Sequence, residues 1–440
     1  MSVTRERSAP RIVAVEHAEQ NRQTKAPTDG GATHGRRAME RQLERCCGLD
    51  VHKESIAACV RLGGRTGKAE QYVQTFGTTV AELLVLHDWL AAHGVTHVAM
   101  ESTGVFWKPV FYALESDFTC LLVNAAHIKQ VPGRKTDVQD CVWIAQLLEH
   151  GLLRGSVVPP APIRDLRDLT RYRKALIHDR TRVANRLHKA LEEAGIKLAS
   201  VASDILGVSG RAMLAALVQG TTDPAVLADL ARASLRRKLP ALRQALANRF
   251  RPHHAFVLGQ LLAHLDYLEE AITTISTEIE RVMAPFAEPL RRLDTIPGIN
   301  QRTAEVILAE MGPDMSAFPS ARHLASWAAL CPGQHESAGK HKSGKTRKGN
   351  RWLRTALIEA AAGASRAKNS ALQARFRRVL RHRGPKKAVV AVAHALLRMV
   401  YHVWPTERSI AKPALITTIV TTANASRVVP SRRLNARATA

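Results

Sequence analysis

Short apolar runs alternate with helical spacings over the first third of the chain. Residues 46–62 are apolar and partly alternating, which predicts a strand, and residues 71–75 follow as its hairpin partner. Two more short strands are predicted at residues 95–100 and 119–123. The remaining segments have the spacing of helices, at residues 80–92, 107–114 and 138–149. Strands that alternate with helices indicate an α/β domain, which we place at residues 45–160.

The middle of the chain, residues 161–290, is predicted to be helical. Four residues recur every seven positions in an Arg-rich segment: Leu169, Leu176, Val183 and Ala190. A clearer seam follows, with apolar residues three and four positions apart in alternation: Leu258, Leu261, Leu265, Leu268, Ile272, Ile275, Ile279 and Val282. This spacing predicts a coiled coil within or between chains, and we expect it to hold subunits together in a dimer or tetramer. A long helix packed on its own domain is the alternative.

Residues 291–405 form a third predicted domain, also helical. It begins with Thr295-Ile296-Pro297-Gly298-Ile299, a turn between two helical patterns. Such a turn opens a helix whose backbone N–H groups can face a phosphate, as in helix-hairpin-helix DNA-binding units, although ordinary turns share the motif. Residues 1–44 are rich in charge, Gly, Thr and Ala without a period, which predicts a disordered extension. Residues 406–440 remain as a tail.

The charge balance of the chain is strongly basic. Its 440 residues include 64 Lys and Arg against 38 Asp and Glu, a net charge of +26. This excess predicts an acidic partner, of which nucleic acid is the commonest and an anionic membrane surface the competitor. No apolar run approaches the roughly 20 residues that span a bilayer, and the N-terminus lacks the apolar core of a signal peptide. We therefore expect a soluble cytoplasmic protein that acts at the nucleoid and not at a membrane.

The cysteines give no sign of a metal site. The chain has six: Cys46, Cys47, Cys59, Cys120, Cys141 and Cys331. None of them forms a C-x-x-C pair, which argues against a structural zinc site. Buried thiols in a reducing compartment are the expected state.

Four acidic residues lie where an α/β domain places its chemistry. Asp50 is inside the first apolar strand, where an ionised carboxylate is costly unless it has a partner or a metal. Glu101 ends another predicted strand, and strand ends are the usual place of chemistry in such sheets. Asp137 and Asp140 are three residues apart at a helix start, which puts both carboxylates on one face.

Four carboxylates from two strands and one helix could hold two Mg²⁺ ions, with Mn²⁺ as the alternative metal. Such ions lower the pKa of an attacking water and stabilise the leaving oxygen in phosphoryl transfer. Each acid alone also has an ordinary explanation. Asp137 could be an N-terminal helix residue favoured by the helix dipole, and Glu101 an exposed strand end.

A Gly-punctuated basic loop precedes a predicted helix at residues 352–367. Between Lys340 and Arg398 the chain has 17 Lys or Arg and one acid, Glu359. We expect this density to bind phosphates with an affinity that falls with salt. The residues concerned are Lys340, Lys342, Ser343, Lys345, Arg347, Lys348 and Arg351. A basic face that binds nucleic acid without chemistry is the alternative.

The same loop contains two candidate nucleophiles, Ser337 and Ser343. A serine beside a small residue, a glycine and a lysine could attack a phosphodiester. It would need a base or a metal, because a free hydroxyl is a weak nucleophile.

Taken together, these motifs resemble a known family. Gly48-Leu49-Asp50-Val51-His52, Met100-Glu101-Ser102-Thr103-Gly104 and Lys135-Thr136-Asp137-Val138-Gln139-Asp140 are similar to the three acidic motifs of the DEDD transposases of bacterial insertion sequences. Other motifs resemble the C-terminal transposase domain of that family: Pro297-Gly298-Ile299, Pro332-Gly333, Glu336-Ser337-Ala338-Gly339-Lys340, and Ser343-Gly344 through Gly349-Asn350. The resemblance covers about residues 45–405, in the right order.

The resemblance implies a fold and a mechanism. It implies an RNase H-like, RuvC-like N-terminal domain in which Asp50, Glu101, Asp137 and Asp140 bind Mg²⁺. It also implies a C-terminal serine that attacks DNA to form a phosphoserine link, with Ser337 as the best match and Ser343 second. Members of the family are guided by a structured RNA from their own element and assemble through the helical middle.

The sequence therefore predicts a transposase of a bacterial insertion sequence. Its parts are an RNase H-like α/β domain, a coiled-coil helical middle and a helical serine-bearing domain. DNA and a guide RNA are the expected partners. The first alternative is a metal-dependent junction-resolving nuclease, in which water attacks and no serine link forms. The second is an inactive nucleic-acid-binding derivative of a transposase.

Overall fold

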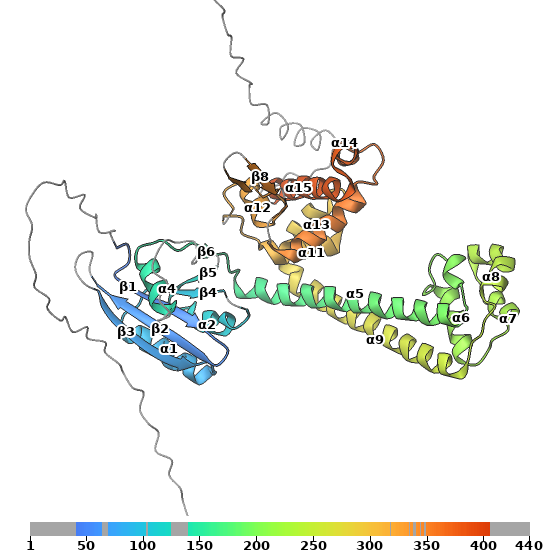
Figure 1. Ribbon diagram of the computed structural model, residues 1–440, viewed down its shortest axis with the longest axis horizontal. Helices are drawn as coiled ribbons and strands as arrows, with labels where there is room; N and C mark the ends of the chain where they lie inside the picture. The colour runs from blue at the N-terminus through green and yellow to red at the C-terminus, as the bar shows by residue number, and fades with distance from the viewer. Residues whose placement is uncertain are drawn as a thin grey trace, which may run out of the picture. The chain divides into compact units, whose positions relative to one another are not determined.

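The computed structural model describes residues 41–63, 69–102, 104–124, 140–316, 318–333, 335–337, 340–343, 345–346 and 349–404. The backbone alone is considered at residues 335–337 and 340–343. The chain divides into two compact units between Val158 and Pro159 (Figure 1). The first 40 residues and the C-terminal tail lie outside the described residues, so the predictions made for them stay predictions. Among the described residues, no helix is both long enough and apolar enough to cross a lipid bilayer.

The first unit is built on a six-stranded mixed sheet of order β3-β2-β1-β4-β5-β6. Its strands are β1 (Arg45–Val51), β2 (Ser55–Leu62), β3 (Glu70–Gly77), β4 (His97–Glu101), β5 (Thr119–Val123) and β6 (Gly155–Ser156). β1, β4 and β5 run parallel, while β2 is antiparallel to both of its neighbours and β6 is antiparallel to β5. This arrangement confirms the expectation of an α/β domain.

Helices cover both faces of this sheet. They are α1 (Val80–Ala92), α2 (Trp107–Leu114) and α4 (Asp140–Glu149). α1 and α2 share one apolar core with Leu49 and Met100 of the sheet. α4 packs on the opposite face, where Ile144 and Leu148 meet Ala99. Because β1 and β4 are covered on both sides, they are apolar almost throughout.

The elements predicted for this unit are found, but the strand predicted at residues 95–100 lies at His97–Glu101, and one further prediction needs correction. The helices at residues 80–92 and 107–114 and the strand at 119–123 are confirmed to the residue. Residues 46–62, predicted as a single strand, are two antiparallel strands, and the predicted partner at 71–75 pairs with the second of them. The chain reverses at His52-Lys53-Glu54, where the backbone N–H of His52 donates to the carbonyl of Ser55 at 2.9 Å. This turn contains neither Gly nor Pro, the residues that most often mark a turn between strands, and the sequence pattern therefore did not separate the two strands.

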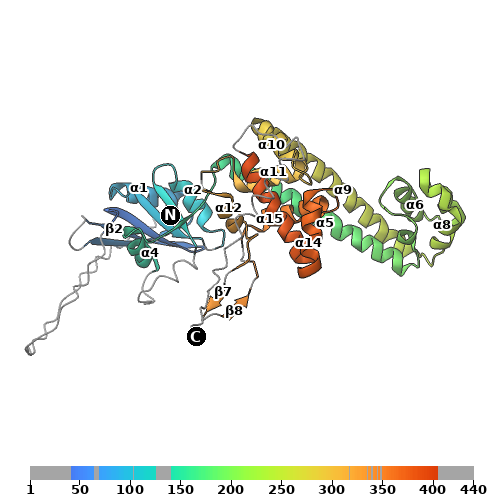
Figure 2. The same cartoon turned by 90° about the horizontal axis from the view of Figure 1, so that it is seen from above.

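The second unit begins with two long helices that lie side by side, α5 (Ala161–Glu193) and α9 (Pro252–Met283) (Figures 1 and 2). They run antiparallel, because Arg180 of α5 pairs with Glu269 of α9 at 2.5 Å, while the start of α5 lies beside the end of α9. The connection between them is helical. It contains α6 (Val208–Val218), α7 (Pro224–Asp229) and α8 (Leu239–Ala245), with 3₁₀ turns at Leu198–Ser200 and Ala233–Lys238.

The rest of the second unit is a helical bundle with one small hairpin. Its helices are α10 (Ala287–Asp294), α11 (Gln301–Met311), α12 (Ala321–Trp327), α13 (Arg351–Ala364), α14 (Ala371–Arg383) and α15 (Pro385–Val403). The hairpin is formed by β7 (His335–Ser337) and β8 (Lys340–Ser343). A 3₁₀ turn at Ala284–Phe286 joins α9 to α10. One apolar core runs from Ile163 on α5 to Trp404 after α15, so the long helices and the bundle fold together.

The predicted apolar seam on α9 packs within the chain. Leu258, Leu265, Ile272 and Ile279 are buried, in the same core as Val183 and other apolar residues of α5. The Arg-rich helix is therefore the partner of the seam, and the intrachain form of the predicted coiled coil is the one adopted. Its buried residues face α5 within the chain, and the expectation that the seam also joins subunits stays a prediction.

This packing gives a prediction about stability. Replacing the fully buried Leu265 with Ala should destabilise the second unit by about 2–5 kcal/mol, because it leaves a cavity between α5 and α9. Tyr267, which is 63% exposed on the same helix, is the matched control, and Tyr267→Ala should have little effect. Urea unfolding measures the change, and light scattering should show an unchanged molar mass in both variants. A smaller assembly with unaltered stability would instead assign the seam to a subunit interface.

Candidate active site

Asp50 and Glu101 occupy neighbouring positions on one face of the sheet. The parallel pairing of β1 with β4 runs to Leu49 opposite Met100, and the two acids are the next residues along their strands. Side chains alternate between the two faces of a sheet. Ala99, two residues before Glu101, packs on the α4 side, and so both β4 positions face α4.

Gly48 determines how closely α4 approaches this face. A Cβ atom on Gly48 would lie 2.3 Å from the carbonyl oxygen of Cys141 and 2.4 Å from the backbone nitrogen of Ala145. Real Cβ atoms do not approach backbone this closely, so the first turns of α4 rest directly on β1. Asp140 is the first residue of that helix, and Asp50 lies two residues beyond Gly48 on the same face. The glycine therefore brings the start of α4 to the strand that carries Asp50.

The other end of α4 is anchored by a buried carboxylate. The side chain of Glu149 is only 2% exposed, and its two oxygens accept from Arg41 and Arg61, each at 2.9 Å. Its backbone carbonyl also accepts from the N–H groups of Gln42 and Leu43. Residues 41–44, which we had assigned to the disordered extension, are thus docked on the domain. Fixed at both ends, α4 holds Asp140 in a defined position.

Both aspartates act on the thiol of Cys141. Burial first, and then the negative charges of Asp50 and Asp140, raise the pKa of that thiol to about 11. Burial also raises the pKa of Cys46 and Cys59 to about 12. These thiols stay protonated at neutral pH, which makes them poor metal ligands. All six cysteines are free thiols, and the prediction that they are buried is confirmed for Cys46, Cys47, Cys59 and Cys141, while Cys120 and Cys331 are only partly buried.

The structure places three of the four predicted acids and adds a histidine. Asp50 is 25% exposed, and its carboxylate meets the ring Nε2 of His52 at 3.1 Å. Asp137 lies outside the described residues, and within them no group of three or more His, Cys, Asp or Glu is positioned to hold a metal ion. The donors that are present fit a hard cation, since carboxylate oxygens are the ligands that Mg²⁺ and Mn²⁺ prefer. Whether Asp137 completes the set is therefore left as a prediction.

Sequence reasoning gave no role to Gly48, His52 or Glu149. A glycine inside an apolar strand is a usable signal, because it often marks the close approach of another backbone. Glu149 carried no such signal, since its two arginine partners are 88 and 108 positions away.

The packing at Gly48 can be tested directly. Gly48→Ala should force α4 away from β1, lowering stability by about 1–3 kcal/mol and displacing Asp140 from Asp50. Gly155→Ala on β6 is the control, because the nearest atom to its added Cβ is a Leu121 side-chain carbon at 3.6 Å, an ordinary contact. Urea denaturation and a DNA strand-transfer assay should separate the two variants. Equal activity in both would show that α4 need not rest on β1.

The candidate serine lies on a hairpin in the second unit. Ser337 ends β7 and pairs through the backbone with Lys340, which begins β8. Ser343 pairs with His335, farther from the turn. Beyond it the ladder continues to a bridge between Pro332 and Thr346. Ser337 therefore belongs to the turn end of the hairpin, and Ser343 to the end nearer the bundle.

The basic residues predicted to bind nucleic acid are divided between the hairpin and α13. Lys340 and Lys342 lie on β8, Lys345 follows it with an exposed side chain, and Arg351 is the exposed first residue of α13. Arg347 and Lys348 lie outside the described residues. The base of the hairpin is tied to α13, because Arg354 donates to Thr346 Oγ1 at 2.7 Å and to the Ala329 carbonyl at 3.2 Å.

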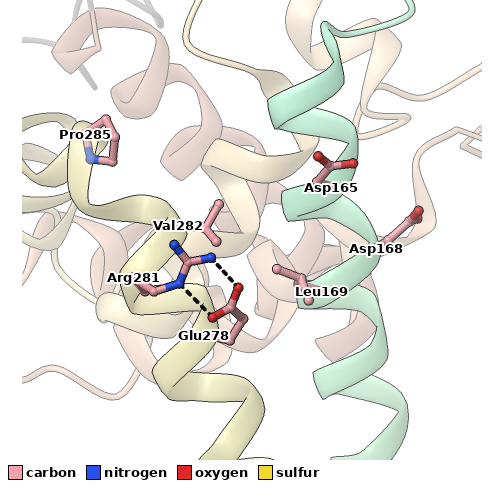
Figure 3. Close-up of a pocket in the computed structure, with 7 residues that line it drawn as sticks. All are labelled: Asp165, Asp168, Leu169, Glu278, Arg281, Val282 and Pro285. Carbon is pink, nitrogen blue, oxygen red and sulfur yellow. Dashed lines mark hydrogen bonds and ion pairs between the residues drawn. The ribbon is translucent and has the colours of Figure 1, made fainter. Parts of the chain in front are cut away.

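A cavity of about 800 Å³ between the start of α5 and the end of α9 is a different kind of surface (Figure 3). Its lining includes the acids Asp165, Asp168 and Glu278. Arg281 forms two hydrogen bonds with Glu278, at 2.7 and 2.9 Å, so one of the three acids is neutralised. The remaining negative charge would repel phosphates, which argues against this cavity as a nucleic-acid site.

Comparison with known families places both sites in context. Residues 47–196, which include all four predicted acids, match a family described as Transposase. Residues 290–377, which include Ser337 and the basic loop, match the Transposase IS116/IS110/IS902 family. The two matches together cover more than half of the chain. This chain belongs to the IS110/IS116 family of insertion-sequence transposases. As a transposase it cuts and rejoins DNA, and its DEDD class depends on divalent metal ions.

Individual relatives agree with this assignment. The transposase is 25% identical to the transposase for insertion sequence element IS1111A of Coxiella burnetii over 353 residues, which are 79% of this chain and 83% of that protein. It is 28% identical to a "Probable family 20 transposase" of Pseudomonas aeruginosa over 304 residues, 68% of this chain and 80% of that protein. A shorter match, 32% identity over 147 residues, joins it to a pilin gene-inverting protein of Moraxella bovis, covering 32% and 45% of the two chains.

Proposed function

We propose that this transposase moves DNA through a metal site on the first unit and a serine nucleophile on the second. The observation that supports the metal site best is the placement of Asp50 and Glu101 at adjacent ends of parallel strands, on the face against which α4 presents Asp140. The strand order, with β2 as the one antiparallel strand among β1–β5, supports an RNase H-like, RuvC-like fold for this unit.

In this proposal Asp50, Glu101, Asp137 and Asp140 hold Mg²⁺, with Mn²⁺ as the substitute. A bound ion would supply positive charge to the phosphate oxygens as negative charge develops on them. The protein's part is to fix the carboxylates: β1 and β4 hold two of them in register, and Gly48 and Glu149 fix α4. His52 lies within hydrogen-bonding distance of Asp50 and would orient that carboxylate.

The covalent step falls to Ser337. Its hydroxyl oxygen forms a bond to phosphorus as one bridging P–O bond of the DNA breaks. The serine proton is released, and the departing DNA oxygen takes up a proton to become a hydroxyl. A hydroxyl of the partner strand then displaces the serine in the reverse sense. One phosphodiester is replaced by another with no water consumed, so rejoining needs no external energy source.

A guide RNA and a homo-oligomer complete the proposal. The net charge of +26 and the basic residues of β8 and α13 provide a surface for two nucleic acids, DNA and a structured RNA from the same element. The seam on α9 packs against α5 within the chain, and the surface that would join subunits in a dimer or tetramer stays a prediction. The site of action would be the nucleoid.

Purified transposase, a DNA carrying the element ends, the transcript of the adjoining noncoding region and Mg²⁺ test the proposal together. Recombinant product should form only when RNA and metal are both present, and EDTA should abolish it. Product without RNA would remove the guide from the proposal. Cleaved but never rejoined DNA would favour a second candidate, a junction-resolving nuclease. The pilin gene-inverting relative favours rejoining, since its name denotes inversion of a DNA segment.

A further inference from the structure

A second cavity, of about 470 Å³, opens in the second unit where α5 meets the first turns of α11 and α13. Its lining includes Arg171 of α5, Arg302 and Thr303 of α11, and Arg351 and Trp352 of α13. The volume is in the range of pockets that bind small ligands, roughly 300–1,000 Å³. Only Arg351 among these residues belonged to the predicted nucleic-acid-binding set.

The carboxylates that line this cavity are already neutralised. Glu310 is fully buried and accepts two hydrogen bonds from Arg171, at 2.7 and 2.8 Å, and one from the Asn350 amide at 2.6 Å. Glu359 accepts from Lys174 at 2.8 Å. Each acid therefore has its own cation, and neither would repel an anion that enters.

Two further cations are left over. Arg302 and Arg351 both have exposed side chains, and the described residues give neither of them a carboxylate partner. Two positive charges at one concave surface attract an anionic group, and guanidinium groups suit the oxygens of a phosphate.

The N-terminal ends of α11 and α13 both line the cavity. α11 is capped by Asn300 and α13 by Asn350, each through its own side chain. Gly298, in the turn before α11, has φ +90°, and a Cβ there would lie 2.7 Å from the Ala360 carbonyl of α13. The turn is thus pressed against α13. Both helix N-termini add positive potential to that of the arginines.

Trp352 gives the cavity a flat apolar surface. The indole is half-buried, and the guanidinium of Arg351 lies 4.7 Å from its ring centroid, with that of Arg171 at 5.8 Å. Indole rings and guanidinium planes are the groups on which unpaired bases stack. A single nucleotide carries a phosphate next to a base. This cavity offers a phosphate site next to a surface on which a base can stack.

We propose that this cavity holds one nucleotide of a single-stranded nucleic acid, with the phosphate against Arg302 and Arg351 and the base against Trp352. This rests on the proposed function, because it needs a nucleic-acid substrate with an unpaired segment. A duplex does not fit the proposal, since its bases are stacked on one another and unavailable to the indole.

The test is binding of labelled oligodeoxythymidine to the full chain, followed by fluorescence anisotropy as salt is raised. Trp352→Leu should weaken binding roughly five- to a hundredfold, the effect of losing one stacked base, and Trp352→Phe should restore most of it. Arg302→Gln and Arg351→Gln should each weaken binding and reduce the salt slope by roughly 0.7. Arg236→Gln, which removes an exposed charge from the 3₁₀ turn at Ala233–Lys238, is the matched control and should leave the slope unchanged. Thermal unfolding checks that the variants fold.

An abasic strand of equal length and the matching duplex complete the design. Loss of the Trp352 effect on the abasic strand supports base stacking. An equal Trp352 effect on the duplex overturns the single-strand assignment. If the normal chain binds the oligonucleotide and no cavity variant changes its affinity, the cavity does not hold a nucleotide, while the proposed function stands. If the normal chain binds no nucleic acid, both fail.

Discussion

Replacing Asp50 with Asn should abolish strand transfer and leave the first unit folded. The carboxylate of Asp50 is one of two that β1 and β4 hold side by side, and the amide has the same shape without the negative charge. We expect a loss on the order of a hundredfold or more, because even residues that only orient metal ligands change activity by about 10- to 100-fold. Glu101→Gln and Asp140→Asn should behave alike.

The fold should tolerate the changes at Asp50 and Asp140 because both carboxylates reach solvent. Asp50 is partly exposed and Asp140 is exposed at a helix start, so neither is a buried ion-pair partner like Glu149. Neutralising one of several nearby carboxylates also relieves repulsion when no metal is bound. Thermal unfolding in EDTA should therefore show variants at least as stable as the normal protein.

The matched control is Asp88→Asn on α1. Its carboxylate is 85% exposed, and α1 covers the sheet face opposite α4, so strand transfer should be unchanged. Product formation is measured over a Mn²⁺ titration, which would reveal weakened metal binding as a shift to higher concentration. Full activity in any two of the three acid variants would remove the metal-site proposal.

Among the helices, the sequence predicted best those with one covered face. The pattern of residues 80–92 gives α1 to the residue, because its buried positions Leu83, Leu86 and Leu90 follow the helical period. Residues 46–62 failed because β1 and β2 are apolar on both faces and show no period to interrupt. The turn between them, His52-Lys53-Glu54, contains neither Gly nor Pro to mark it.

Partners across long separations could not be predicted. The spacing of the apolar seam on α9 predicts that another helix packs against it. The same spacing would fit a helix of another chain or α5 of this chain. The choice follows from pairs such as Arg180 of α5 with Glu269 of α9, at 2.5 Å, which join residues 89 positions apart. Nothing in the local sequence distinguishes these charges from solvated ones.

The acids of the candidate active site could be proposed from the sequence because carboxylates at strand ends are chemically conspicuous, and their role stays a prediction. The contacts that support them could not be proposed. Gly48 and Glu149 act through contacts with α4 and with distant arginines, which only the folded chain reveals. The cavity beside Trp352 was missed for the same reason, since its cations come from three helices.

The serine proposal predicts a covalent intermediate that can be trapped. A DNA substrate nicked near the cut site lets the strand needed for rejoining diffuse away, so the phosphoserine cannot be resolved. The denatured protein should then migrate more slowly on a gel until the DNA is digested. Ser337→Ala should lose both the adduct and recombination, because no other atom occupies the place of the hydroxyl.

Ser343→Ala is the matched control and should keep the adduct, with weaker DNA binding at most. The hairpin register motivates this choice: Ser337 is at the turn end, opposite Lys340 and next to Ala338 and Gly339, whose small size allows a phosphate to approach. Ser343 is at the other end of β8, in the run of lysines, where contact with backbone phosphates is the expected role. An adduct that persists in Ser337→Ala and disappears in Ser343→Ala would reverse the assignment. Cleavage with no adduct in the unsubstituted protein would mean that water attacks the DNA, as in a metal-dependent nuclease.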